Sequence, residues 1–100
     1  MAEKRLSTED EIRSALEELS GWVRRGKAIE RSFELKAFKA AMAFAGTVAE
    51  LAERADHHPD ILIQYDKVTL TLWSHDLGGI TDRDLRLARQ IDAAARDQMA

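Results

Sequence analysis

The feature that most constrains the fold is the alternation of apolar residues between positions 61 and 72. Every second residue is apolar on either side of a polar dipeptide, Asp66-Lys67. This period of two is typical of β-strands that bury one face. A two-residue turn at 66–67 would pair the apolar residues of the two strands with one another: Tyr65 with Val68, Ile63 with Leu70, and Ile61 with Leu72. The segment therefore predicts an antiparallel hairpin with one buried face.

A second hairpin is predicted over residues 22–35. Ile29, Phe33 and Leu35 share one parity with charged residues between them, and Arg25-Gly26 offers a turn. The two hairpins together predict a four-stranded antiparallel sheet.

Three segments have the periodicity of amphipathic helices. Thr8 precedes an acidic turn and a helical run that ends near Gly21, and Thr81 with Asp84 resembles a capping box that starts the last helix. The longest candidate covers residues 37–56, with one apolar face formed by Phe38, Met42, Ala45, Val48, Ala49 and Ala52. The prediction is one α+β domain over residues 1–100, in the order α-β-β-α-β-β-α, with three helices packed on the sheet.

Charge and composition narrow the classes of partner. Fifteen basic and 18 acidic residues give a net charge of −3 and form no block of like charge, which argues against direct binding to nucleic acid or to membranes. Cysteine is absent, which is typical of a reducing compartment, and we expect a soluble cytoplasmic protein. A chain of this size buries a modest core, so self-association is expected to help.

The three histidines of the chain are expected at one end of the sheet. Continuing the hairpin register outward places His58 opposite His75. His57 and His58 end the long helix, because Pro59 disfavours a helical conformation in the residue before it. The sequence therefore predicts that His57, His58 and His75 gather where the last strand ends.

Each candidate residue also has a structural interpretation. His57 could cap the helix carbonyls, Asp84 could cap the last helix, and Trp22 and Trp73 could be packing residues. Three imidazoles are a common zinc set, but adjacent histidines rarely reach one ion, and no HExxH spacing or cysteine pair is present.

General acid–base chemistry fits the three histidines better than the other reactions considered. Ser74 beside His75 lacks the sequence of a nucleophile elbow, which argues against hydrolysis. Neighbouring imidazoles can supply a proton donor and an acceptor near neutral pH. Asp56, Asp76 or Asp84 could orient them.

The residues around the histidines resemble the signature of the pterin-4a-carbinolamine dehydratases. The resemblance lies in Glu53-Arg54-Ala55-Asp56-His57-His58-Pro59, followed by Tyr65, His75 and Asp84. Residues 19–22, 33–36, 66–68 and 81–85 also match the family's usual pattern, so the resemblance covers nearly the whole chain. Ile61 and Leu77 depart from it, where the family often has an aromatic residue and a cysteine.

The resemblance implies a dehydratase without metal or cofactor. Its substrate would be 4a-hydroxytetrahydropterin and its product quinonoid dihydropterin, in the recycling of the tetrahydrobiopterin used by aromatic amino-acid hydroxylases. The catalytic set implied is His57 and His75 as acid and base, His58 holding the pterin, and Asp84 in support. The substrate-binding residues implied are Asp56, Trp73, Ser74, Asp76, Glu53 and Arg83.

The resemblance also implies a homodimer or homotetramer. The alternative function is a non-catalytic protein-binding module on the same fold, either a transcriptional coregulator or an assembly factor. The alanine-rich second helix would be the interface in either case.

Overall fold

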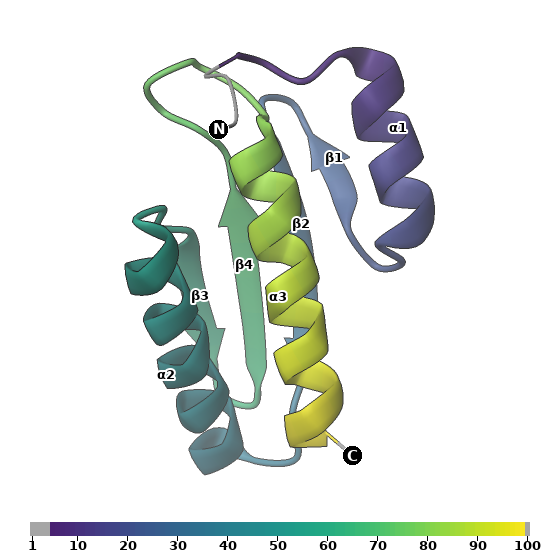
Figure 1. Cartoon of the computed structure of the whole chain (residues 1–100). Coiled ribbons are helices and arrows are strands. Elements are labelled where there is room, and N and C mark those ends of the chain that lie inside the picture. Colours follow the sequence, from purple (N-terminus) through teal and green to yellow (C-terminus); the bar gives the residue numbers. More distant parts are fainter. Residues whose placement is uncertain (1–4, 100) are drawn as a thin grey trace.

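A computed structural model describes residues 5–99 and confirms the predicted fold class and element order (Figure 1). The elements are α1 (Glu9–Glu18), β1 (Val23–Arg25), β2 (Ala28–Glu34), α2 (Phe38–Ala55), β3 (Asp60–Gln64), β4 (Lys67–Leu72) and α3 (Asp82–Met99).

The four strands form one antiparallel sheet in the order β1-β2-β4-β3. Helices α2 and α3 lie side by side over one face of this sheet, and α1 lies at its β1 edge (Figure 1). The opposite face carries polar side chains, among them Ser32 and Thr69, whose hydroxyl oxygens are 2.8 Å apart. The domain thus has two layers, a sheet and a layer of helices, and the apolar face of the sheet lies toward the helices.

The hairpin β3–β4 forms, but its predicted register was wrong. Gln64 pairs with Lys67 and Ile63 with Val68, so the turn is Tyr65-Asp66 and not Asp66-Lys67. Tyr65 has a φ of 56° and is 71% exposed, which makes it a turn residue and not a member of the buried face. Moving the turn by one residue shifts the register by two, so every side chain keeps its face and the alternation could not distinguish the two pairings.

The turn of the other predicted hairpin is also displaced, in this case to one residue later than expected. Arg25 pairs with Ala28, which makes Gly26-Lys27 the turn. Gly26 has a φ of 57°, in the left-handed region that glycine adopts without steric cost.

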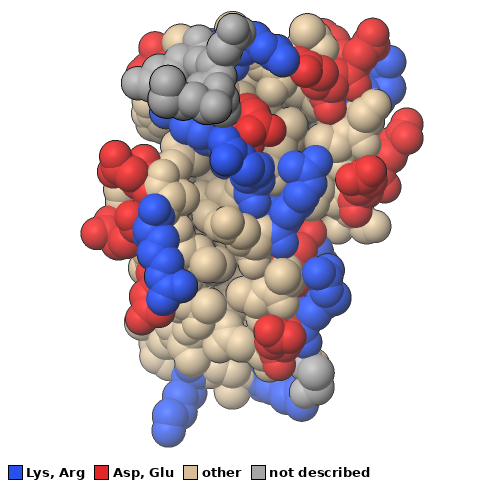
Figure 2. All heavy atoms as spheres, in the orientation of Figure 1, with Lys and Arg blue, Asp and Glu red and all other residues tan. Residues whose placement is uncertain are grey.

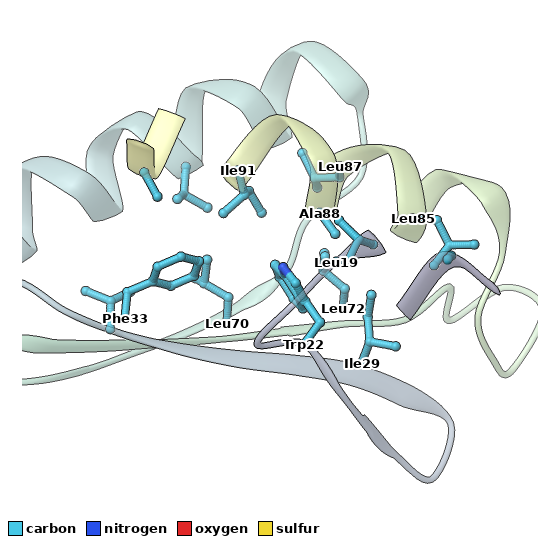
Figure 3. Close-up of a cluster of buried hydrophobic side chains, with 14 of the residues drawn as sticks. Leu19, Trp22, Ile29, Phe33, Leu70, Leu72, Leu85, Leu87, Ala88 and Ile91 are labelled. Carbon is cyan, nitrogen blue, oxygen red and sulfur yellow. The ribbon is translucent and has the colours of Figure 1, made fainter. Parts of the chain in front are cut away.

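The core lies between the sheet and the helices (Figure 3). Ile29, Leu70 and Leu72 of the central strands are fully buried, and the edge-on ring of Trp22 packs beside Phe33 at 6.4 Å between ring centroids. Helix α3 covers them with side chains at helical spacing: Leu85, Ala88, Ile91 and Ala95. This packing fixes the start of α3, and hence Asp84, against the end of β4.

Helix α1 begins with a complete capping box. The Thr8 hydroxyl accepts from the backbone N–H of Glu11, and the Glu11 carboxylate accepts from the backbone N–H of Thr8. Hydrogen bonds from the Arg5 guanidinium and from Thr8 lower the pKa of Glu11 from 4.5 to about 2. The first helix is therefore anchored by a charged side chain at its positive end.

The predicted apolar face of α2 was only half right. Ala45, Val48 and Ala52 are buried, whereas Phe38 is 51% and Met42 46% exposed. Apolar residues surround much of this helix, and a single sheet covers one side, so the rest of the apolar surface faces outward. In Figure 2 uncharged side chains fill the centre of the lower half of the face formed by α2 and α3, with charged side chains around them. Within residues 5–99 no helix, α2 included, combines the length and apolarity needed to cross a bilayer.

Candidate functional site

The end of α2 turns His57 into the protein. Asp56 has a left-handed conformation with a φ of 50°, and the backbone N–H of His57 donates to the carbonyl of Ala52 at 3.1 Å. Aspartate tolerates this conformation better than most residues. The sharp turn ends the helix and leaves the His57 side chain 9% exposed.

His57 meets a buried carboxylate at the start of α3. Its Nε2 lies 2.5 Å from Oδ1 of Asp84, which is fully buried. The other carboxylate oxygen, Oδ2, accepts from the Ser74 hydroxyl and from the backbone N–H of Thr81, each at 2.9 Å. Asp84 thus caps the start of α3 and is also the partner of His57, so its structural role as a helix cap and its role beside a candidate catalytic histidine are compatible.

His58 faces the other way. It is exposed, and its Nε2 forms a hydrogen bond with the exposed carboxylate of Glu53, one turn back along α2. The His58 ring is thus at the surface, whereas His57 is largely buried.

His75 begins the turn that follows Ser74, beyond the end of β4. Its ring stacks on the indole of Trp73, with 3.7 Å between centroids and 30° between planes. Ser74 lies between them and is fully buried, because successive side chains of an extended segment point to opposite faces.

Ser74 also anchors the loop that carries His75. Its carbonyl accepts from the backbone N–H groups of Leu77, Gly78 and Gly79, and its own N–H donates to the carbonyl of Gly79 at 2.7 Å. Ser74 therefore supports two of the histidines. Its side chain contacts Asp84, the partner of His57, and its backbone closes the loop that carries His75.

The remaining predicted residues surround these groups. Arg83 donates from Nη2 to Oδ1 of Asp76 at 2.7 Å, which ties the loop to α3, and the side chain of Asp56 is exposed. A hollow of about 190 Å³ opens beside His57. Its lining is Ala55, His57, Arg83, Arg86, Leu87 and Gln90.

A larger hollow of about 650 Å³ lies elsewhere, between α1 and α3. It contains no histidine, and two of its carboxylates, Glu11 and Asp82, are paired with Arg5 and Arg86. The histidine end of the sheet is therefore the candidate site.

The prediction that the histidines share one end of the sheet is confirmed, because β3 begins and β4 ends there. The prediction that His58 lies opposite His75 rested on a register that was wrong by two residues, and the observed ladder ends at the pair of Asp60 and Thr71, before it reaches either histidine. The three imidazoles have three different partners: Asp84, Glu53 and Trp73. Within residues 5–99 no three histidine or acidic side chains are arranged to hold a metal ion.

Thr81 is the site residue that the sequence interpretation treated only as a helix cap. Its hydroxyl oxygen lies 2.7 Å from that of Ser74 and accepts from the backbone N–H of Arg83 at 3.2 Å. The capping-box spacing of Thr81 and Asp84 was the available signal, but it gives no indication that Ser74 and His57 join the same network.

The fold and the site define a small α+β protein with a histidine–carboxylate pair and two further histidines at one end of its sheet. The family model for pterin 4 alpha carbinolamine dehydratase matches residues 5–94. The chain belongs to this family of pterin dehydratases.

Relatives and solved structures agree with this assignment. A relative from Thermomicrobium roseum is 54% identical over 80 residues, which cover 80% of this chain and 86% of its own. Another from Nocardia farcinica is 50% identical over 91 residues, covering 91% and 96%. Each is named "Putative pterin-4-alpha-carbinolamine dehydratase".

Two solved structures share the fold. A transcriptional coactivator/pterin dehydratase from Brucella melitensis superposes with a TM-score of 0.87 at 39% identity, over 91% of this chain and 99% of the other. A pterin dehydratase-like protein described as a RuBisCO assembly factor in the alpha-carboxysome gives a TM-score of 0.65 at 25% identity, over 76% and 90%.

Proposed function

We propose that this protein removes water from 4a-hydroxytetrahydropterin by histidine acid–base catalysis and returns quinonoid dihydropterin for recycling. The observation that carries the proposal is the buried pair of His57 and Asp84, at the same end of the sheet as His58 and His75. Membership of the pterin dehydratase family supplies the substrate class.

The reaction requires one proton to be given and one to be taken. The 4a-hydroxyl leaves as water after it receives a proton, and a ring nitrogen loses its proton as the C=N bond forms. An acid and a base on opposite sides of the pterin can perform both transfers without a net change in protons. His57 and His75 are the pair that we assign to this task, because each has a fixed orientation, one against Asp84 and the other on Trp73.

The surrounding residues suit a polar bicyclic ligand. His58 is exposed beside Glu53, and both can form hydrogen bonds with the pterin edge. Asp56, Asp76 and Arg83 supply further polar groups around the same end. The hollow beside His57 is smaller than the roughly 300–1,000 Å³ of typical ligand pockets, so the pterin would lie across an open surface.

The proposal is tested with purified protein and enzymatically generated 4a-hydroxytetrahydropterin. His57→Ala and His75→Ala should each lower the rate by about 10²-fold or more, the lower end of what a general acid or base contributes. Lys27→Ala, in the exposed turn between β1 and β2, is the control and should keep the wild-type rate. Variants with the wild-type rate at both histidines would refute the assignment.

A protein-binding role is the second candidate, and the exposed apolar side of α2 favours it. Phe38 and Met42 are about half exposed, although large apolar side chains are usually buried. The two solved relatives are described as a transcriptional coactivator/pterin dehydratase and as an assembly factor. We propose that this side of α2 holds a second copy of the chain in a homodimer or homotetramer, which is consistent with the small core.

A further inference from the structure

The hydrogen bonds around Asp84 run in one direction. Ser74 has a single hydroxyl proton, which it donates to Oδ2 of Asp84 at 2.9 Å. The 2.7 Å contact between the hydroxyls of Ser74 and Thr81 must therefore use the Thr81 proton. Thr81 in turn accepts from the backbone N–H of Arg83. The chain of donors leads from the first turn of α3 through both hydroxyls to the carboxylate.

This series of hydrogen bonds determines which oxygen of Asp84 is left to pair with His57. Oδ2 already accepts two hydrogen bonds, so Oδ1 is the oxygen left for Nε2 of His57. A carboxylate oxygen accepts and does not donate, which makes Nε2 the protonated nitrogen of the neutral ring. The lone pair then lies on Nδ1.

Nδ1 is also the nitrogen that a ligand can reach. Within residues 5–99 every fully buried side-chain nitrogen and oxygen has a hydrogen-bond partner. Nδ1 of His57 has no partner in that part of the chain, so it is open to solvent, and the residue borders the hollow beside α3.

We propose that Ser74 and Thr81 are positioning residues that act through Asp84 to make His57 the base, with Nδ1 as the proton-accepting atom. The inference rests on the proposed dehydratase function and states which histidine takes a proton and which one gives it. His57 takes the proton from the pterin ring nitrogen, and the resulting imidazolium lies against the Asp84 carboxylate. His75 then supplies the proton to the leaving hydroxyl.

The role differs from the one that the family resemblance implies for Ser74. A residue that binds substrate has to reach it, whereas Ser74 is fully buried and its hydroxyl proton is committed to Asp84. Loss of the hydroxyl should therefore lower kcat and leave KM nearly unchanged, because the bound state of the pterin does not involve it.

The test combines a spectroscopic and a kinetic measurement. Nitrogen-15 NMR of the His57 ring in the wild-type protein should show a protonated Nε2 and an unprotonated Nδ1. Ser74→Ala and Thr81→Val should mix the two tautomers and lower kcat about tenfold, with KM within about twofold of wild type. Thr81→Ser keeps the hydroxyl and should restore both readouts. Ser32→Ala removes a hydroxyl from the equivalent pair with Thr69 on the open face and should change neither.

The outcomes separate this inference from the proposed function. A protonated Nδ1 in the wild type, or a rise in KM at unchanged kcat in Ser74→Ala, would overturn the positioning role even in an active enzyme. An inactive wild-type protein with the expected tautomer would overturn the dehydratase and leave the hydrogen-bond chain in place. The wild-type spectrum decides the tautomer even if Thr81→Val fails to fold.

Discussion

Asp92 joins α3 to the sheet through one carboxylate oxygen. Its Oδ1 accepts from Nε1 of Trp22 at 2.9 Å and from Nη1 of Arg31 at 3.0 Å. The Trp22 side chain is buried, whereas Arg31 is 30% exposed and also lies over the ring of Phe33. The two donors therefore differ in what they lose when the carboxylate is removed.

The expected cost of Asp92→Ala follows from this difference. The indole N–H of Trp22 would be left buried without an acceptor, which costs about 1–3 kcal/mol. Arg31 can turn toward water and loses about 1 kcal/mol or less. We expect the free energy of unfolding to fall by about 1–4 kcal/mol in total. This is a large part of the roughly 5–15 kcal/mol that stabilises a typical domain.

The assay is urea unfolding followed by far-ultraviolet circular dichroism at one fixed protein concentration, because self-association would add to stability. Asp10→Ala is the matched control: its carboxylate is also paired with an arginine, but at the exposed surface, so the change should be below about 0.5 kcal/mol.

A double-mutant cycle tests the reasoning itself. In a Trp22→Phe background no indole N–H is left to satisfy, so Asp92→Ala should cost about 1–3 kcal/mol less than in the wild type. An equal cost of Asp92→Ala in both backgrounds would refute the claim that the orphaned donor dominates.

Three further predictions concern the core, the first helix and the surface of α2. Phe44→Ala should destabilise the fold by about 3–5 kcal/mol in the same assay, because Phe44 is fully buried; a loss below about 1 kcal/mol would contradict the packing. Glu11→Gln should lower Tm at neutral pH. The difference in Tm between wild type and variant should shrink below about pH 4.5, the pKa of Glu11 in the unfolded chain, and vanish near pH 2, its pKa in the folded protein, because the ionised carboxylate is what stabilises the fold. A Tm difference that persists at pH 2 would point to packing instead. Phe38→Asp with Met42→Asp should shift the assembly to monomer in light scattering while Tm at low concentration changes little, and an unchanged mass would place the interface elsewhere.

The sequence predicted the layers of the fold because its strongest signals are local. Alternation at 61–72 and the capping residues Thr8 and Thr81 each depend on a few neighbouring positions. The register of β3 against β4 could not be predicted in the same way, since a shift of two residues preserves every buried side chain. The observed turn also makes a contact that is distant in sequence: the backbone N–H of Leu35 donates to the carbonyl of Asp66 at 2.8 Å.

The candidate site shows the same division. That the histidines share one end of the sheet follows from the element order alone. The partner of each ring does not, because His57 and Asp84 are 27 positions apart and meet only when α2 and α3 pack side by side. The exposed side of α2 could not be predicted for a related reason. When apolar residues lie around most of a helix, the sequence does not indicate which of them the sheet will cover.

The central claim is most directly tested by the rate of water loss from 4a-hydroxytetrahydropterin with chelator-treated wild-type protein, compared with the spontaneous rate. We predict an acceleration that grows in proportion to protein concentration and is the same before and after chelation. A rate equal to the spontaneous one would contradict the dehydratase function, and activity that returned only with added zinc would contradict catalysis by the histidines alone.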